Sequence, residues 1–301
     1  MARSRLRHWV RRIVIAITII VVAFLFVVFP VAASFLITNG HFKFPERGPK
    51  TPEAVGLQVL PAEFASSDGI PLKGWWNPGD AAKPVVIFSH GLNRSRLEML
   101  ERAAESNRRG YGVLLFDLRN HGESGRAYTT LGIHESRDIC AAGGFVKGKA
   151  PGRPQVLWGV SMGASSALIA AKHCPGFAAA ISDSSFLSFR ETVAHHLGLY
   201  FRLPAFPIAN LIVATTGLRM GLDPDDGDVE QAVKDINIPI LFIAGSNDRR
   251  MPPELADRLL NAAKHPGKKL IVVPNAKHGE AFTTNREMYQ NSAFEFLGQV
   301  R

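Results

Sequence analysis

Residues 159–163 read Gly-Val-Ser-Met-Gly and follow the apolar run 155–158, so Ser161 stands between two glycines at the end of a hydrophobic segment. Residues 164–172 (ASSALIAAK) are rich in alanine and leucine and predict a helix that begins near Met162. A serine on so sharp a turn needs neighbours without bulk, which Gly159 and Gly163 supply. The stretch therefore predicts a strand, a strained turn carrying Ser161 and a helix that starts at the serine. The alternative interpretation is a glycine-rich loop that only closes a strand.

Short apolar runs on both sides of this stretch alternate with helix-like segments. The runs occupy residues 85–89, 113–117, 156–159, 178–182, 240–244 and 270–273, and the predicted helices occupy 94–108, 134–145, 162–173, 253–264 and 285–297. Short and nearly continuous apolar runs are typical of buried parallel strands. Residues 55–64 and 70–76 suggest an antiparallel start to the sheet. The order predicts an α/β fold with a doubly wound, mostly parallel sheet.

Residues 186–236 interrupt this alternation and contain no strong strand pattern. An insertion after a strand of such a sheet emerges at the carboxyl edge, where ligands bind, so we expect a helical cap there. Its apolar stretch 203–215 is too short to span a bilayer and is broken by Pro204 and Pro207. Two interpretations stay open for these helices, a substrate lid and simple packing on the core.

The N-terminal segment predicts a membrane anchor. Residues 13–37 carry no charged side chain, and 25 residues of helix at about 1.5 Å each exceed a hydrocarbon core of about 30 Å. This transmembrane helix is expected to kink at Pro30. Five arginines in the basic segment 1–12 predict a cytoplasmic N-terminus and a domain on the non-cytoplasmic side. The alternative is a cleaved signal peptide, but the run is longer than the usual ~7 to 15 apolar residues, which favours an uncleaved signal anchor.

The remainder of the chain, residues 38–54, predicts a linker, followed by one folded domain over 55–301. The formal net charge is +9, of which the five N-terminal arginines account for five. No basic stripe with interleaved aromatics is evident, so we expect no nucleic-acid partner. Cys140 and Cys174 lack metal-ligand spacing and are expected to be buried free thiols, with a disulfide between them as the alternative in an oxidising compartment. No metal or organic cofactor is expected.

The polar residues that a serine nucleophile needs follow two later strands. Asp248 comes after the strand 240–244, and His278 comes after the strand 270–273. A carboxylate at Asp248 would hold the imidazole of His278 in one tautomer, and His278 would act as general base toward Ser161. The competing role for Asp248 is to cap the helix that starts at residue 253. Asp183 also ends a strand and is a rival acid.

An oxyanion hole is predicted from two backbone amides. The strand 85–89 runs into His90, Gly91 and Leu92, and a glycine there lets the chain turn so that a backbone N–H faces the site. The amides of Leu92 and Met162 would together bind the negative charge of a tetrahedral intermediate, and each lost donor costs roughly 3 to 4 kcal/mol.

Five motifs follow one another along the chain, namely HG at 90–91, DLRNHGES at 117–124, GVSMG at 159–163, GSNDRRMPP at 245–253 and KHG at 277–279. In this order they resemble the motifs of the α/β-hydrolase superfamily. The resemblance covers residues 55–301. Within the superfamily, the chain looks most like membrane-anchored α/β-hydrolase-domain proteins and the serine aminopeptidase and monoacylglycerol-lipase-like group. The resemblance implies that Ser161 is the nucleophile, Asp248 the acid and His278 the base, with Leu92 and Met162 as oxyanion amides.

The expected function is a membrane-anchored serine hydrolase that cleaves an ester or related acyl bond of a small-molecule or lipid substrate through an acyl-enzyme on Ser161. The same intermediate serves a thioesterase, a peptidase or an acyltransferase, because the triad does not specify the bond or the second acceptor. A membrane-tethered binding module without catalysis is the alternative from another class.

Overall fold

The structure is a computed structural model that describes residues 2–39, 45 and 48–300. The chain forms two compact units, a smaller one made of Met1–Ile37 and Arg190–Pro224 and a larger one made of Thr38–Phe189 and Asp225–Arg301. The predicted insertion 186–236 is therefore divided, because residues 186–189 and 225–236 belong to the larger unit. Part of the predicted linker, residues 40–44 and 46–47, lies outside the described residues.

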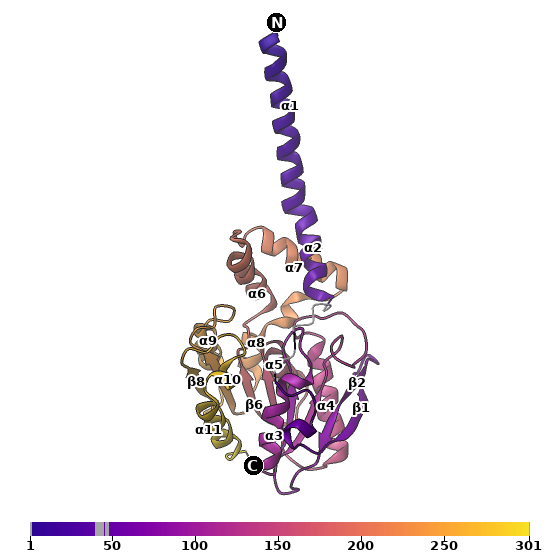
Figure 1. The fold of residues 1–301 in the computed structure, drawn as a ribbon, viewed down its shortest axis with the longest axis vertical. Helices are drawn as coiled ribbons and strands as arrows, with labels where there is room; N and C mark the ends of the chain where they lie inside the picture. The colour runs from indigo at the N-terminus through magenta and orange to yellow at the C-terminus, as the bar shows by residue number, and fades with distance from the viewer. Residues whose placement is uncertain (1, 40–44, 46–47, 301) are drawn as a thin grey trace. The chain divides into compact units, whose positions relative to one another are not determined.

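An eight-stranded sheet forms the centre of the larger unit, in the order β1-β2-β4-β3-β5-β6-β7-β8. Figure 1 shows β1 and β2 on one side of this unit and β8 on the opposite side. The β1–β2 and β2–β4 pairs are antiparallel, and every later pair is parallel. The predicted doubly wound sheet with an antiparallel start is confirmed. The strands are β1 Leu60–Ala65, β2 Pro71–Asn77, β3 Val85–Ser89, β4 Gly112–Phe116, β5 Gln155–Val160, β6 Phe177–Asp183, β7 Ile240–Gly245 and β8 Lys269–Val273.

Helices alternate with these strands much as the sequence predicts. The helix predicted over 94–108 begins as a 3-10 turn, Arg96–Met99, which Ser95 caps by accepting a hydrogen bond from the Leu97 amide. The helix predicted over 134–145 continues to Lys149, since Val146 extends its buried face. The helices of the larger unit are α3 Leu100–Arg108, α4 Glu135–Lys149, α5 Met162–His173, α8 Val229–Asp235, α9 Pro253–Ala262, α10 Ala281–Thr284 and α11 Arg286–Leu297.

Both faces of the sheet are covered by helices, because alternate side chains of each strand point to opposite faces. One set of alternate strand residues, including Val86, Trp158 and Ile181, forms a buried core with apolar side chains of α3 and α11. The opposite face of the sheet is covered by a second set of helices, in which α4 packs beside α5, α5 beside α8 and α8 beside α9. Covering both faces explains why the strands read as continuous apolar runs.

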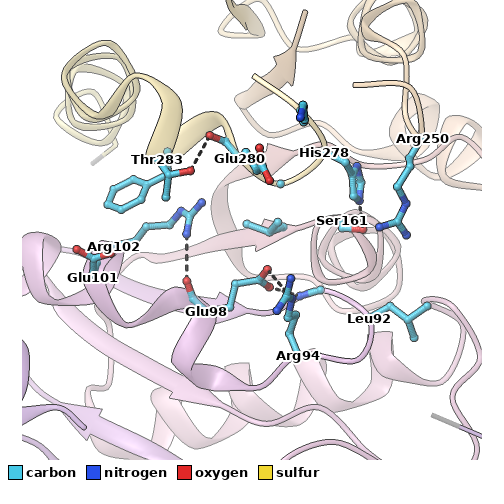
Figure 2. Close-up of a pocket in the computed structure, with 15 residues that line it drawn as sticks. Leu92, Arg94, Glu98, Glu101, Arg102, Ser161, Arg250, His278, Glu280 and Thr283 are labelled. Carbon is cyan, nitrogen blue, oxygen red and sulfur yellow. Dashed lines mark hydrogen bonds and ion pairs between the residues drawn. The ribbon is translucent and has the colours of Figure 1, made fainter. Parts of the chain in front are cut away.

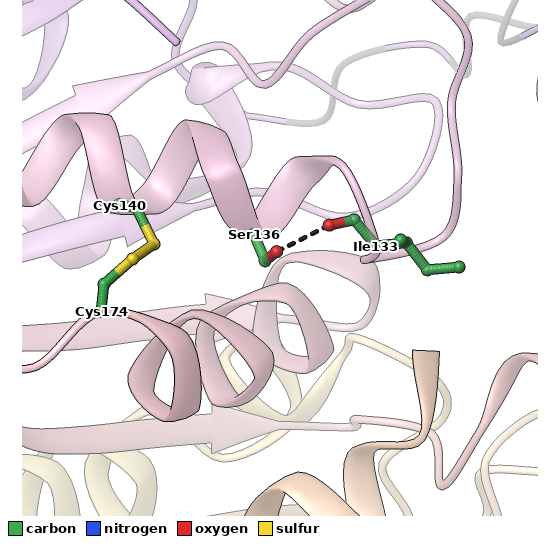
Figure 3. Close-up of a disulfide and its surroundings, with 4 residues drawn as sticks. All are labelled: Ile133, Ser136, Cys140 and Cys174. Carbon is green, nitrogen blue, oxygen red and sulfur yellow. Dashed lines mark hydrogen bonds between the residues drawn. A yellow bond between two sulfur atoms is a disulfide. The ribbon is translucent and has the colours of Figure 1, made fainter. Parts of the chain in front are cut away.

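The two cysteines form a disulfide, so the prediction of buried free thiols is wrong. Cys140 lies on α4 and Cys174 ends α5, with a Cα–Cα distance of 5.8 Å across a sequence separation of 34 (Figure 3). These two helices pack side by side, and the pairing depends on that contact, which the linear sequence does not display. Both residues are half-buried. Structural disulfides are typical of proteins in oxidising compartments.

Within the part of the chain that the structure describes, one helix is long and apolar enough to cross a membrane, and nearly all of it belongs to the smaller unit. The span Arg5–Thr38 has a mean hydropathy of 3.2, and it is built from α1 Ala2–Ala23, a π-helical turn Phe24–Val28 and α2 Phe29–Thr38. The π-helical turn precedes Pro30, which has no N–H to donate to the preceding turn. The helix continues through Pro30 to Thr38, so the irregularity near this proline takes the form of a π-helical turn.

The inserted segment of the smaller unit is helical and contacts the end of the apolar span. It contains most of α6 Phe189–His196, a π-helical turn Leu197–Phe201 and α7 Ile208–Met220. The hydroxyl of Ser34 accepts hydrogen bonds from Thr216 Oγ1 at 3.0 Å and from Arg219 Nε at 3.1 Å. The rings of Phe29 and Phe201 meet edge to face at 5.3 Å. These contacts fasten α2 to the insertion, which joins two segments far apart in the sequence.

Candidate active site

Ser161 occupies the strained turn between β5 and α5. Its backbone angles are φ 54° and ψ −119°, in a region that side chains rarely adopt, and its amide donates to the carbonyl of Asp183 at 2.8 Å. A side chain on Gly163 would clash with the backbone of Ser89, and one on Gly159 would clash with the backbone of Gly163. The two glycines are therefore required because the helix approaches the strands closely at this turn.

The structure brings together the three side chains that the sequence predicts. His278 Nε2 lies 2.8 Å from Ser161 Oγ, and His278 Nδ1 lies 2.7 Å from Asp248 Oδ2. The second carboxylate oxygen of Asp248 accepts the amides of Arg250 at 2.9 Å and Met251 at 2.8 Å. Figure 2 shows His278 directed at Ser161. Asp248 thus holds its own loop and the histidine, whereas the cap considered for it is not found, because Pro252 is the N-cap of α9 and no side chain caps that helix.

These contacts fix which nitrogen of His278 carries the proton. A carboxylate only accepts hydrogen bonds, so Nδ1 donates to Asp248 and the neutral ring leaves Nε2 free to accept from Ser161. The carboxylate side chain is fully buried, whereas the imidazole is 10% exposed. Burial keeps water from competing for the Asp248 bond, and the exposed edge of the ring allows a substrate to approach.

A pocket of about 400 Å³ opens beside Ser161 and His278. Leu92 lies in its wall, and Met162 is the first residue of α5, directly after the serine. The assignment of the amides of these two residues as oxyanion donors stays a prediction. The lining residues are Gly91, Leu92, Arg94, Glu98, Glu101, Arg102, Val160, Ser161, Arg250, Lys277, His278, Gly279, Glu280, Phe282 and Thr283.

Two side chains outside the predicted catalytic and oxyanion residues hold the loop that carries Leu92. Glu98 Oε2 accepts the amide of Gly91 at 2.7 Å, and His121 Nε2 accepts the amide of Asn93 at 3.1 Å. The amides on both sides of Leu92 are thus fixed by side chains. In the sequence, His121 lies within the DLRNHGES motif at 117–124, and this motif was the signal from which its role could have been found.

Asp183, the rival acid, is used for another purpose. It is fully buried below the turn, where its carboxylate accepts the hydroxyl of Tyr289 at 2.9 Å and lies 3.7 Å from Arg102. Burial raises the pKa of Asp183, and the charge of Arg102 opposes that rise. The hydroxyl of Tyr289 in turn accepts from Trp158 Nε1 at 3.2 Å. This network supports the β5 and β6 ends under Ser161.

His90 makes stability depend on pH. The ring is completely buried, its Nδ1 lies 2.8 Å from the carbonyl of Gly91, and its Nε2 accepts the amide of Leu118 at 3.1 Å, a pattern that requires the neutral form. Burial, aided by the charge interaction with His121, lowers the pKa of His90 to about 3. The unfolded chain, with a histidine pKa of ~6.5, binds the extra proton first, so stability is lost as pH falls below ~6.5.

Between pH 7 and pH 5 we therefore expect His90 to account for a loss of about 2 kcal/mol in the free energy of unfolding, at ~1.4 kcal/mol per pH unit below ~6.5. Urea unfolding at both pH values measures it. His90→Asn should be less stable at pH 7 but should lose less on acidification than the wild type. His173→Asn, at an exposed histidine, is the control and should keep the wild-type loss. Equal losses in wild type and His90→Asn would contradict the prediction.

The sequence and the fold of this chain are similar to those of known proteins. Residues 86–289 match the family described as "Alpha/beta hydrolase family". Protein YqkD of Bacillus subtilis is 30% identical over 267 residues, which cover 87% of this chain and 84% of that protein. Human monoglyceride lipase is 26% identical over 266 residues, covering 76% of this chain and 86% of the lipase.

Among solved structures, the esterase Pf2001 of Pyrococcus furiosus superposes with a TM-score of 0.70 at 26% identity, covering 86% of this chain and 97% of the esterase. The family match begins in β3 and ends in α11, so it includes the loops that carry Ser161, Asp248 and His278. A sheet of this topology, a strained serine after β5 and a match over most of the chain lead to one conclusion. The chain belongs to the alpha/beta hydrolase family.

Proposed function

We propose that this protein is a membrane-anchored serine hydrolase that cleaves an ester or related acyl bond of a small-molecule or lipid substrate. The observation that carries the proposal is the continuous chain of hydrogen bonds from Ser161 Oγ through His278 to Asp248, with distances of 2.8 Å and 2.7 Å. Nucleophile, base and orienting acid within hydrogen-bond reach are the signature of covalent catalysis by serine. The names of two similar proteins, a monoglyceride lipase and an esterase, support an ester as the substrate.

The reaction follows from the positions of these groups. His278 Nε2 takes the proton of Ser161 as its Oγ attacks the acyl carbon, and Asp248 stabilises the imidazolium that forms. The amides of Leu92 and Met162 stabilise the oxyanion of the tetrahedral intermediate. The imidazolium then gives its proton to the departing alcohol, which leaves the acyl group on Ser161. Water, deprotonated by His278, attacks this ester, and the acid is released as Ser161 regains its proton.

The test of this function compares the wild-type chain with Ser161→Ala, using hydrolysis of a panel of ester, thioester and aminoacyl-amide substrates and labelling by a fluorophosphonate probe. Labelling at Ser161 and hydrolysis that depends on it support the proposal, and the preferred member of the panel defines the acyl bond. Full esterase activity in the Ser161→Ala chain would overturn it.

For the membrane anchor, we propose an uncleaved helix over residues 13–37 with a cytoplasmic N-terminus and the hydrolase domain on the opposite side. The arginines that precede the span support this orientation, and the Cys140–Cys174 disulfide supports an oxidising location for the domain.

Protease treatment of sealed membrane vesicles checks this orientation. We expect digestion of the hydrolase domain in right-side-out vesicles and protection in inverted vesicles, with the chain pelleting with membranes after a carbonate wash. A replacement of the five arginines in 1–12 by glutamine should weaken the orientation preference, because the positive charges set it. Protection in right-side-out vesicles, or release of the domain by the wash, would contradict the proposal.

A further inference from the structure

Arg250 is a charged residue of the pocket that the proposed reaction does not use. Its backbone amide donates to Asp248 Oδ1 at 2.9 Å, which fixes the start of its side chain next to the proposed triad. The side chain extends into the pocket in the direction of Ser161 (Figure 2). Its Nε is buried and has no hydrogen-bond partner, and among the described residues no carboxylate pairs with its guanidinium. Buried polar groups in folded proteins almost always have partners, so this one requires an explanation.

The other arginines of the pocket differ from Arg250 because their charges are compensated. Arg94 lies 3.8 Å from the carboxylate of Glu98, and Arg102 lies 3.7 Å from that of Asp183. Glu101, a carboxylate of the same wall, is already paired with Arg286 at 2.6 Å. The pocket therefore holds neutralised ion pairs on the α3 side, and the guanidinium of Arg250 faces the space beside Ser161.

The charges that line the pocket also leave a positive excess. Four lining side chains are basic and three are acidic. Arg94 and Arg102 are compensated by carboxylates, and Glu101 is compensated by Arg286. The signs of Lys277 and Glu280 are opposite, so the positive charge left over is that of Arg250. A guanidinium presents donors in a planar fork that matches the oxygens of a carboxylate or a phosphate.

We propose that Arg250 forms an anion subsite, so that the preferred substrate is an ester carrying a carboxylate or phosphate group close to the acyl bond that is cleaved. This inference rests on the proposed serine hydrolase and specifies its substrate class. The negative group binds the guanidinium of Arg250, including the buried Nε, while the acyl carbon lies at Ser161 Oγ. The compensated arginines 94 and 102 keep their present partners.

The experiment measures kcat/KM for two matched pairs of esters in the full chain. In the first pair the acyl part differs, 4-nitrophenyl hexanoate against the 4-nitrophenyl half-ester of adipic acid. In the second pair the alcohol differs, 1-butyrylglycerol against 1-butyrylglycerol 3-phosphate. Each pair is measured with the wild type, Arg250→Gln, Arg250→Lys and the control Arg249→Gln, whose exposed side chain does not line the pocket.

We expect the anionic member of at least one pair to be preferred, and the pair concerned shows whether the anion belongs to the acid or to the alcohol. Arg250→Gln should lower the anionic-to-neutral ratio of kcat/KM about 10- to 100-fold, the usual effect of losing a hydrogen bond to a charged group. Arg250→Lys should retain part of the ratio, and Arg249→Gln should retain all of it. An equal loss on both members of a pair would show a role in the chemistry itself and would overturn the anion subsite.

Binding to the Ser161→Ala chain separates this proposal from the proposed function. Calorimetry with the same esters should show tighter binding of the anionic member, and the added Arg250→Gln change should remove that preference. If the wild type hydrolyses no ester but the binding preference depends on Arg250, the serine hydrolase proposal fails and the anion subsite stands. If hydrolysis depends on Ser161 while neither rate nor binding distinguishes the pair members, the anion subsite is wrong.

Discussion

Replacing Ser161 by alanine is expected to lower kcat for ester hydrolysis by about four to six orders of magnitude and to abolish fluorophosphonate labelling. The Oγ of Ser161 is the atom that receives the acyl group. Among the described residues, the pocket has no second nucleophile at the same hydrogen-bond distance from His278 Nε2. Fold and substrate binding should survive, because alanine lacks only the hydroxyl of serine and adds no bulk to the turn. Residual activity then measures what the predicted oxyanion amides supply without covalent catalysis.

The control for this prediction is Ser67→Ala, at an exposed serine outside the pocket, which should keep wild-type labelling and rate. Circular dichroism and thermal unfolding of the Ser161→Ala chain establish that it is folded. Mass spectrometry of the labelled wild type should place the phosphonate on the peptide that contains residues 159–163. A label on another serine, or a loss of rate below about tenfold, would contradict the assignment of Ser161.

Replacing Asp248 by asparagine is expected to lower kcat about 10⁴-fold while KM changes little. In the wild-type chain the backbone amides of Arg250 and Met251 donate to Asp248 Oδ1, and the amide oxygen of the new side chain can still accept both hydrogen bonds. The amide NH₂ group then faces His278 Nδ1, so the ring must accept at Nδ1 and carry its proton on Nε2. In that tautomer His278 cannot take the proton of Ser161, although every atom of the site stays near its position.

Asp257→Asn is the matched control, because it makes the same chemical change nearby in the chain. Asp257 lies on α9, and its side chain is exposed. It should leave kcat and KM at their wild-type values. Raising the pH should rescue part of the Asp248→Asn rate, since hydroxide can take the serine proton directly. A loss below about 100-fold would mean that Asp248 only holds its loop and does not orient His278.

Several features of the fold were predictable because they are local. The turn at 159–163 is recognisable as two glycines around a serine, and the contact that requires Gly159 lies only four residues away, at Gly163, whereas the contact that requires Gly163 is with Ser89 on β3. The strands β3 to β7 appear as buried apolar runs, and the helix after Ser161 occupies Met162–His173 as predicted. The run 270–273 also forms a strand, but β8 lies at the edge of the sheet and only Val273 in it is buried. The positions of Asp248 and His278 also followed from the pattern, because side chains after parallel strands meet at one edge of the sheet.

Other features could not be predicted because they depend on contacts between distant segments. The disulfide required α4 and α5 to place Cys140 and Cys174 at a Cα–Cα distance of 5.8 Å, and their spacing of 34 residues gives no sign of it. The attachment of Ser34 to Thr216 and Arg219 likewise joins the first helix to an insertion far along the chain. The supporting roles of Glu98 and His121 near Leu92 depend on side-chain directions that no periodicity encodes.

The sequence by itself determined the order of strands and helices, the strained serine and the identity of its partners, since hydrophobic period, glycine placement and chain order are readable in one dimension. Only the tertiary structure decided the distances of 2.8 Å and 2.7 Å that join Ser161, His278 and Asp248, the uncompensated guanidinium of Arg250 beside them and the pairing of the cysteines. Hydrogen bonds and charge compensation require atoms within a few ångströms of each other, and such proximity between residues 30 to 117 positions apart exists only once the sheet has folded.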